Sequence, residues 1–324
     1  MANGYKKRAI YSLKTNAVNF KTKKMKIRYI FTILGFCFVQ LAVKAQQNTN
    51  YNQYGNTVIP VNTAGSFLYK DAQVSLIGRY QWVDLEGAPT AYRLAASMPI
   101  GKSDLRVGLN IRHENVSVEK LGEALAFVGK QVQLSGKDYL AVSLGAGVSY
   151  YNGNFSQLSS SDPLFSNDLR ETEGMLTASA MYYRPDKFYA GLSVPRLTFS
   201  KLGLGSSSLN YDASTLYHFT AGAVFSLGTD FDLKPATLVS YAKNLDIQAD
   251  VSAMVYVKKT FGLGANIGTA GEIAALASLF IKNLNIGFGY QFAASSEPLT
   301  RTFNNNTYEF SLTYRFGKGF GGLL

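Results

Sequence analysis

The residue types most often used for catalysis and metal binding are scarce in this chain. It has two histidines, His113 and His218, and neither has two further ligands at a recognisable metal-binding spacing. A protein zinc site takes three or four such ligands. We therefore expect both histidines to lie at a rim or in a loop, and we predict no metal site.

An acidic cluster occurs between residues 152 and 174, at Asp162, Asp168, Glu171 and Glu173. A calcium site is one interpretation, because carboxylates are common calcium ligands. The spacing matches no defined calcium loop, however. A solvated acidic loop is the interpretation that we favour.

Two glycine-containing segments share part of a nucleotide-binding pattern. Residues 101–103 read Gly-Lys-Ser, but a phosphate loop also needs a glycine where this chain has Ala96. Residues 262–268 have GxGxxxG spacing without a helix after them, and we expect these glycines to relieve crowding in a curved sheet. The chain also lacks a G-x-S-x-G segment. We predict no enzymatic activity, no catalytic residue and no cofactor.

The net charge of +11 comes almost entirely from the first 45 residues. These contain ten basic side chains and no acidic one, which accounts for +10, and the rest of the chain is close to neutral. A nucleic-acid-binding surface is basic over one face of a folded domain. We therefore expect no nucleic-acid partner.

The basic start is followed by an apolar run over residues 29–43 and by small residues up to Ala45. This order predicts a Sec signal peptide over residues 1–45. The basic residues after Met25 already suffice for such a signal, so residues 1–24 are either an over-extended start or a long basic region. A transmembrane helix is the alternative, but the run is short for the roughly 20 residues that a span needs.

The single cysteine, Cys37, lies inside this apolar run. Phe36 stands before it, where a lipoprotein signal has a small residue, so we do not expect lipidation. Cleavage after Ala45 would leave 324 − 45 = 279 residues without cysteine. Disulfides and cysteine zinc sites are then excluded from the mature chain.

Short segments of alternating apolar and polar residues fill the mature chain, and this period of two predicts β-strands. Near the C-terminus, for example, Leu312 is expected to face one side of the sheet and Ser311 the other. Six tight polar turns and seven longer connections join fourteen such segments, expected at residues 74–82, 90–99, 105–116, 124–134, 139–151, 175–183, 188–194, 216–227, 231–242, 247–257, 261–267, 272–281, 284–293 and 307–316.

An even strand count, with tight turns at one end and longer loops at the other, is typical of an outer-membrane barrel. Lipid offers no hydrogen bonds, so a spanning sheet must close on itself. A soluble β-sandwich is the alternative, but it would show charge on its outer faces, and charge in these strands is sparse. We predict an all-β fold, a transmembrane antiparallel barrel of about 14 strands over residues 72–318, with an N-terminal periplasmic arm (46–71) and a short C-terminal tail (319–324).

Five arginines share the inward phase of strands that become neighbours when the barrel closes: Arg79, Arg93, Arg106, Arg112 and Arg315. They could line a basic lumen, or they could pair with inward acids such as Glu114 and Glu309. An internal ion-pair network that rigidifies the barrel is the interpretation that we favour, because ionisable residues in membrane proteins usually face the interior and pair there.

The only tryptophan, Trp82, lies in the apolar phase at the outer end of the first strand. An aromatic belt places amphipathic rings at the level of the lipid headgroups. We favour this anchoring role over a binding site.

The residues around Trp82 also carry a family resemblance. Gln81-Trp82, Gly87-Ala88-Pro89-Thr90 and the later Pro99 resemble the signature of the PorP/SprF family of type IX secretion system membrane proteins. Upstream, Gln53-Tyr54 and Asn62-Thr63-Ala64-Gly65 resemble the family's Gln-Tyr and Asn-Pro-Ala motifs, with a threonine where the family has proline. The resemblance covers roughly residues 53–318.

This resemblance implies a non-enzymatic outer-membrane barrel of Bacteroidota. Members support export or surface attachment of cargo with C-terminal sorting domains, often adhesins of gliding motility. The implied partners are outer-membrane lipid, other type IX secretion components including a periplasmic peptidoglycan-linked lipoprotein, and the secreted cargo. A passive porin or small-solute transporter is the alternative function, in which the inward arginines would select anions. The sequence leaves open whether the lumen is open or plugged.

Overall fold

The computed structural model describes residues 51–83, 85–158, 167–204, 215–243, 245–269, 271–293, 306–317 and 322–323. The predicted signal peptide, the cysteine and the acidic residue at position 162 lie outside these ranges. Within them, none of the helices has both the length and the apolar character needed to cross a membrane.

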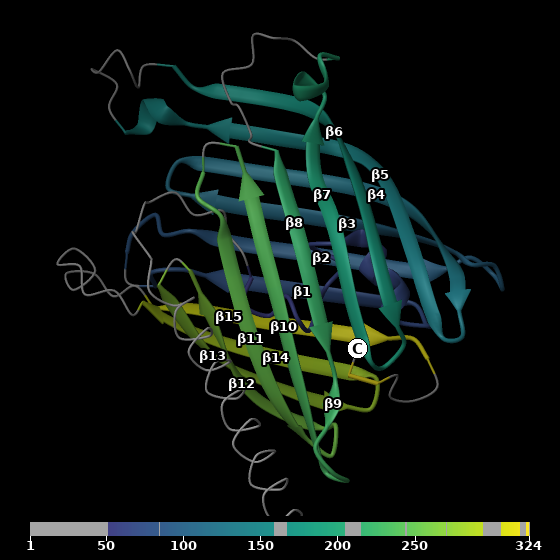
Figure 1. Ribbon diagram of the computed structural model, residues 1–324. Coiled ribbons are helices and arrows are strands. Elements are labelled where there is room, and N and C mark those ends of the chain that lie inside the picture. The colour runs from purple at the N-terminus through teal and green to yellow at the C-terminus, as the bar shows by residue number, and fades with distance from the viewer. Residues whose placement is uncertain are drawn as a thin grey trace, which may run out of the picture. The chain divides into compact units, whose positions relative to one another are not determined.

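The described strands form one antiparallel sheet that closes into a barrel (Figure 1). The strands are β1 (Gln73–Tyr80), β2 (Thr90–Pro99), β3 (Leu105–Val116), β4 (Glu119–Ser135), β5 (Asp138–Gly153), β6 (Leu169–Arg184), β7 (Phe188–Thr198), β8 (Leu216–Ala223), β9 (Phe225–Ser226), β10 (Phe231–Ala242), β11 (Gln248–Val257), β12 (Phe261–Gly268), β13 (Glu272–Ile281), β14 (Leu284–Ala293) and β15 (Thr307–Arg315).

The ring is complete because β1 pairs with both β2 and β15, and β10 pairs with β11. The short β9 and β8 both pair with β10 and are separated only by Val224, so they act as one interrupted strand. The described residues therefore form a barrel of fourteen strands, as the sequence predicted.

Burial along the strands is the reverse of that in a soluble protein. On β15, the polar Glu309, Ser311 and Thr313 are buried, whereas Phe310 and Leu312 are exposed. The apolar face is turned outward because it meets lipid, and the polar face is turned into the lumen. The predicted orientations of Ser311 and Leu312 are therefore confirmed.

Three strands extend at one end at least four residues beyond the predicted bounds. β4 begins at Glu119 rather than at 124, β6 begins at Leu169 rather than at 175, and β7 ends at Thr198 rather than at 194. Pairing between strands continues through these polar stretches. Glu119 on β4, for example, still pairs with Gly153 on β5. Backbone hydrogen bonds do not require an apolar side-chain pattern, so the alternation underestimated the strand length.

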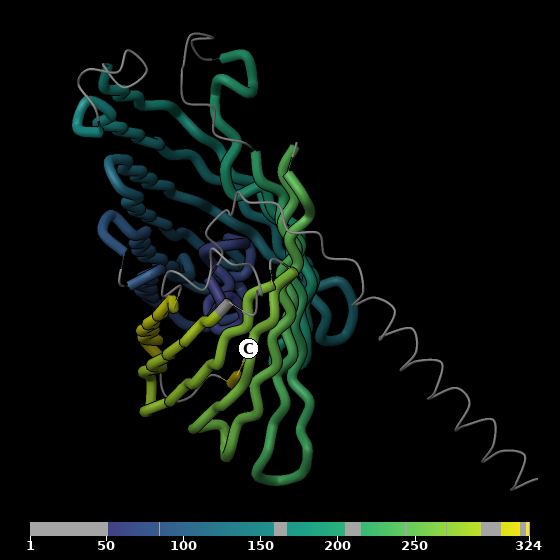
Figure 2. The backbone as a smooth tube through the Cα atoms, turned by 90° about the vertical axis from the view of Figure 1, so that its left-hand side faces the viewer, coloured from purple at the N-terminus to yellow at the C-terminus, as the bar shows by residue number. Residues whose placement is uncertain are grey.

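Residues 51–69, called the plug below, fold inside the barrel, where every one of them is buried. Figure 2 shows this segment in purple, enclosed by the strands. It contains one short 3-10 helix, η1 (Thr63–Leu68), which contacts β4, β5, β6 and β7. We expected a periplasmic arm over residues 46–71, but its described part does not extend away from the barrel. Its apolar residues pack against inward-facing ones such as Met181, Tyr189 and Leu238.

The described end of the chain also turns back into the lumen. Leu323 is buried against Met254, Tyr256 and Phe280. Its carbonyl oxygen accepts a hydrogen bond from the Lys234 ammonium. The sequence predicted a tail here without assigning it a place, and this part of it helps to fill the barrel.

Candidate functional site

The plug meets the barrel wall through buried polar contacts, and Glu309 is the centre of the first group. Its carboxylate accepts hydrogen bonds from the Asn52 backbone N–H at 2.9 Å and from the Asn52 side-chain amide at 3.1 Å. The Arg79 guanidinium lies 2.5 Å from the same oxygen. This carboxylate therefore joins the plug to β1 and β15. The sequence prediction that Glu309 pairs with an inward arginine is confirmed.

A second group of contacts joins the plug to β10 and β11. The Tyr54 hydroxyl donates to the backbone oxygens of Ala236 and Asp250, at 3.1 and 3.0 Å. The Asn56 side-chain oxygen accepts from the Tyr256 hydroxyl at 3.0 Å, and the Lys234 ammonium lies 3.5 Å away from it. The plug is thus bound to two separate parts of the wall, with β12, β13 and β14 between them.

The motif residues 62–65 form the third group, on β5, β6 and β7. The Thr63 hydroxyl lies 3.0 Å from that of Ser143 and 2.9 Å from that of Ser179. The Asn62 amide donates to the carbonyl oxygens of Ala180 and Leu192, at 3.3 and 3.2 Å. Residues that carry the family resemblance therefore hold the plug in place.

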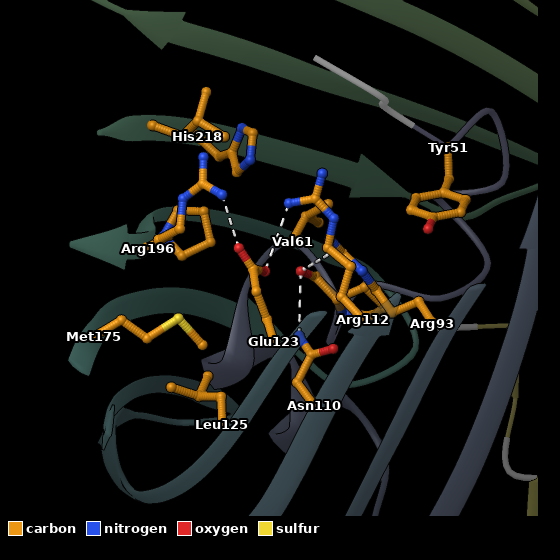
Figure 3. A pocket seen from close by; sticks show the side chains of 13 residues that line it. Tyr51, Val61, Arg93, Asn110, Arg112, Glu123, Leu125, Met175, Arg196 and His218 are labelled. Atoms are coloured by element: carbon orange, nitrogen blue, oxygen red, sulfur yellow. Dashed lines mark hydrogen bonds and ion pairs between the residues drawn. The ribbon is translucent and has the colours of Figure 1, made fainter. Parts of the chain in front are cut away.

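A pocket of about 50 Å³ remains between the plug and the wall (Figure 3). Its polar lining comes mainly from three arginines and two other ionisable side chains: Arg93 on β2, Arg112 on β3, Arg196 on β7, Glu123 on β4 and His218 on β8. All five residues lie within a few positions of the strand ends that carry the longer loops. The pocket therefore belongs to that half of the barrel.

Ion pairs connect the charged residues of this pocket. Arg112 lies 2.6 Å from Glu114 and 3.5 Å from Glu123, and Arg196 lies 2.8 Å from the other oxygen of Glu123. These side chains are almost completely buried. Of the five predicted arginines, Arg79 and Arg112 therefore form ion pairs with inward acids, and Arg196 is a member of this network that the sequence analysis missed.

Arg93 connects the pocket to the plug. Its guanidinium donates to the Pro60 carbonyl oxygen at 2.7 Å and lies over the Tyr51 ring, 5.2 Å from the centroid. The Asn110 amide makes a longer contact of 3.5 Å to the same carbonyl oxygen. The Pro60 carbonyl is thereby fixed at the floor of the pocket.

The two remaining predicted arginines also face inward, at the opposite end of the plug. Arg106 donates to the backbone oxygens of Tyr69, Lys70 and Asp71, at 2.5 to 3.1 Å. Arg315 stacks over the Tyr69 ring, with 4.2 Å to the centroid. They fix the segment that leads from the plug into β1, so all five predicted arginines contact the plug, its exit or their own acid partners.

The two histidines lie in different environments. His113 is exposed on the outward face of β3, in keeping with the predicted rim position. His218, also expected at a rim or in a loop, is instead buried in the lumen, where its Nδ1 lies 2.9 Å from the Ser240 hydroxyl. Among the described residues, no group of three or more His, Cys, Asp or Glu side chains is arranged to hold a metal ion.

Two described members of the acidic cluster accept hydrogen bonds from backbone amides of neighbouring segments. Asp168 accepts from the Ser156 N–H at 3.1 Å, and Glu173 accepts from the Ser200 N–H at 2.5 Å. Glu171 and Glu173 lie on β6 rather than in a loop. These contacts order the loop ends.

Trp82 lies just beyond the end of β1, with φ of 49° and 38% exposure. It does not line the pocket of Figure 3. In the following turn, Gly87 has φ of 74°, which favours glycine, and its carbonyl oxygen accepts from the Ser117 N–H at 2.8 Å. The turn geometry therefore accounts for this glycine.

Solved structures of other proteins are similar to that of the chain. The CymD monoaromatic hydrocarbon channel is 12% identical, with a TM-score of 0.50 over 87% of this chain and 96% of its own. The toluene transporter TbuX of Ralstonia pickettii is 8% identical, with a TM-score of 0.49 over 81% and 94%. Omp33 of Acinetobacter baumannii is 10% identical, with a TM-score of 0.43 over 77% and 99%.

At 12% identity, the likeness to CymD concerns the fold alone, that of an outer-membrane barrel. No curated protein matches the sequence. A family model described as type IX secretion system membrane protein PorP/SprF matches residues 43–314, which is most of the chain. The chain belongs to the PorP/SprF family of type IX secretion system membrane proteins.

Proposed function

We propose that this outer-membrane protein supports the export or surface attachment of cargo with C-terminal sorting domains, such as adhesins of gliding motility, and has no enzymatic activity. Family membership supports the link to type IX secretion. A periplasmic peptidoglycan-linked lipoprotein is the partner that we expect on the side of the tight turns.

The filled lumen is the observation that carries this proposal. Residues 51–69 are buried inside the barrel, and Leu323 fills part of the remaining space. A barrel occupied by its own chain is well suited to act as a rigid scaffold that presents its rims to other proteins. A passive porin or small-solute transporter needs a continuous water-filled path instead. The polar contacts of the plug with β5, β6, β10, β11 and β15 oppose such a path.

Deleting the gene tests the cargo role. One specific surface protein with a C-terminal sorting domain is expected to accumulate in the periplasm, and the intact gene should restore its surface exposure. Normal surface exposure of all such proteins in the deletion strain would show that the proposal is wrong.

Complementation with a variant whose plug is cross-linked to the wall distinguishes a scaffold function from a pore function. In Thr63→Cys/Ser143→Cys, a disulfide would tie the plug to β5, because the two native hydroxyls are 3.0 Å apart. A scaffold should still restore cargo exposure with this cross-link in place. Loss of complementation only in the cross-linked state, with recovery on reduction, would favour a role that requires an open lumen.

A further inference from the structure

The pocket between the plug and the wall has an unbalanced charge. Three arginines, Arg93, Arg112 and Arg196, contribute positive charge, and two carboxylates, Glu114 and Glu123, contribute negative charge. Both carboxylates are used in ion pairs with Arg112 and Arg196. Arg93 takes part in none of the ion pairs among the described residues, and its recorded hydrogen bond goes to the neutral carbonyl of Pro60. One positive charge therefore remains without a counter-ion.

Several buried polar atoms of the pocket residues also have no hydrogen-bond partner among the described residues. They are three donors, the Nε–H groups of Arg93 and Arg196 and the hydroxyl of Tyr51, and one acceptor, the side-chain oxygen of Asn110. Buried donors in folded proteins nearly always have an acceptor. Three donors around one cavity, beside an uncompensated guanidinium, make it a suitable place for an acceptor with negative charge.

The size of the pocket limits what this acceptor can be. A single water needs roughly 10–15 Å³ of such space, so a pocket of about 50 Å³ holds several waters or one small group. This is too small for a sugar or a nucleotide. Guanidinium groups present planar pairs of donors that match a carboxylate in shape.

We propose that this pocket binds one carboxylate group, with Arg93 as its principal charged partner and Arg196 as a second donor. The carboxylate belongs either to a small free acid or to the end of a peptide chain that enters from the long-loop side. The site is independent of the cargo role proposed above. A ligand here would also contact the plug, because Arg93 binds the Pro60 carbonyl and lies over the Tyr51 ring.

The test uses the purified full barrel in detergent and isothermal titration calorimetry. Sodium acetate is compared with sodium chloride at equal ionic strength, and a short peptide with a free C-terminus is compared with its amidated form. Saturable binding of acetate supports the proposal and indicates a small acid. Binding of the free peptide but not of the amidated one supports it and indicates a chain end. Absence of binding for both acetate and the free peptide overturns it.

Two variants locate the site. Arg93→Gln should weaken carboxylate binding at least about tenfold, because hydrogen bonds to charged groups are strong. Arg170→Gln is the matched control, because Arg170 is exposed on β6 and does not line the pocket. Circular dichroism and heat-modified gel mobility check that each variant folds.

Glu123→Gln should have the opposite effect. It removes a competing carboxylate and releases Arg112 and Arg196, so binding should tighten at least about threefold. If Arg93→Gln does not fold, the carboxylate affinity of Glu123→Gln alone tests the proposal. Equal affinities in the wild-type protein and in Glu123→Gln would overturn the proposal.

Discussion

Glu309→Gln tests the buried ion pair between the wall strands β1 and β15, whose carboxylate also accepts the hydrogen bonds of Asn52 in the plug. The side chains of Glu309 and Arg79 are 0% and 3% exposed and lie 2.5 Å apart. The substitution keeps the size and an acceptor oxygen, so a neutral hydrogen bond from Asn52 can persist. It removes the negative charge and leaves a buried guanidinium without its counter-ion. Breaking one side of a buried pair costs about 3–5 kcal/mol, and we expect a loss of that size in the free energy of unfolding.

Urea unfolding in lipid vesicles measures this loss. Trp82 is the only tryptophan in the chain, so its fluorescence reports on the barrel. Glu86→Gln is the control, because Glu86 is exposed in the loop after β1 and should change stability by no more than about 0.5 kcal/mol. The double variant Arg79→Gln/Glu309→Gln should lose less than the sum of the two single losses, since neither charge is then left alone.

A decrease of less than about 1 kcal/mol in the free energy of unfolding of Glu309→Gln would refute this reasoning, because removing one partner of a buried ion pair destabilises a protein by more than that. Strictly additive losses in the double variant would also contradict it. Either result would mean that Glu309 and Arg79 are separately solvated in the lumen and that their pairing does not stabilise the wall beside the plug.

Three further predictions concern the plug, the lipid face and the sheet. Thr63→Cys/Ser143→Cys should form a disulfide without added oxidant in the periplasm, detected as a cross-linked peptide by mass spectrometry; a permanently reduced pair would mean that the plug does not reside on β5. Leu312→Arg should cost about 2–4 kcal/mol in vesicle unfolding, since Leu312 is 45% exposed on the outward face, whereas Leu312→Phe should be mild; equal losses would contradict the outward assignment. Gly264→Ala should cost about 1–3 kcal/mol, because its Cβ would meet the Ala253 carbonyl oxygen at 2.1 Å, whereas a Cβ at Gly122 meets nothing within 4 Å. Equal stability of the two alanine variants would show that the sheet tolerates side chains at Gly264.

The strands were predictable because the membrane imposes a strict pattern on them. Lipid on one side and a polar lumen on the other make each strand alternate, so β2, β3, β10, β13 and β14 have the bounds expected from the sequence. The inward orientation of the arginines could be predicted from the same alternation. The extra length of β4 and β6 could not be predicted, because beyond the lipid both faces of a strand are polar and the period of two disappears.

Arg196 shows where alternation fails within a strand. The ladder between β6 and β7 shifts register between Leu176 and Ala178. On β7, Ser193 is buried, but so are Arg196 and Thr198, which have the other parity. A bulge inserts one extra residue and moves the inward phase. The sequence ended this strand at 194, before Pro195, and assigned Arg196 to a loop.

The plug could not be predicted from periodicity at all. Its residues pair with no strand, and polar and apolar positions are buried alike because the lumen wall is itself mixed. One consequence concerns Ser311, which faces the lumen. Its hydroxyl donates to the Gln53 side chain of the plug at 2.7 Å. A large residue at Ser311 would therefore displace the plug.

Single-channel recording of the purified barrel in a planar lipid bilayer tests the central claim most directly. A lumen filled by residues 51–69 predicts a closed baseline without steady openings, before and after the Thr63→Cys/Ser143→Cys cross-link forms. Large, steady, anion-selective openings in the wild-type protein that disappear in the cross-linked variant would contradict the account, because they would show that ions pass through the lumen that the plug occupies.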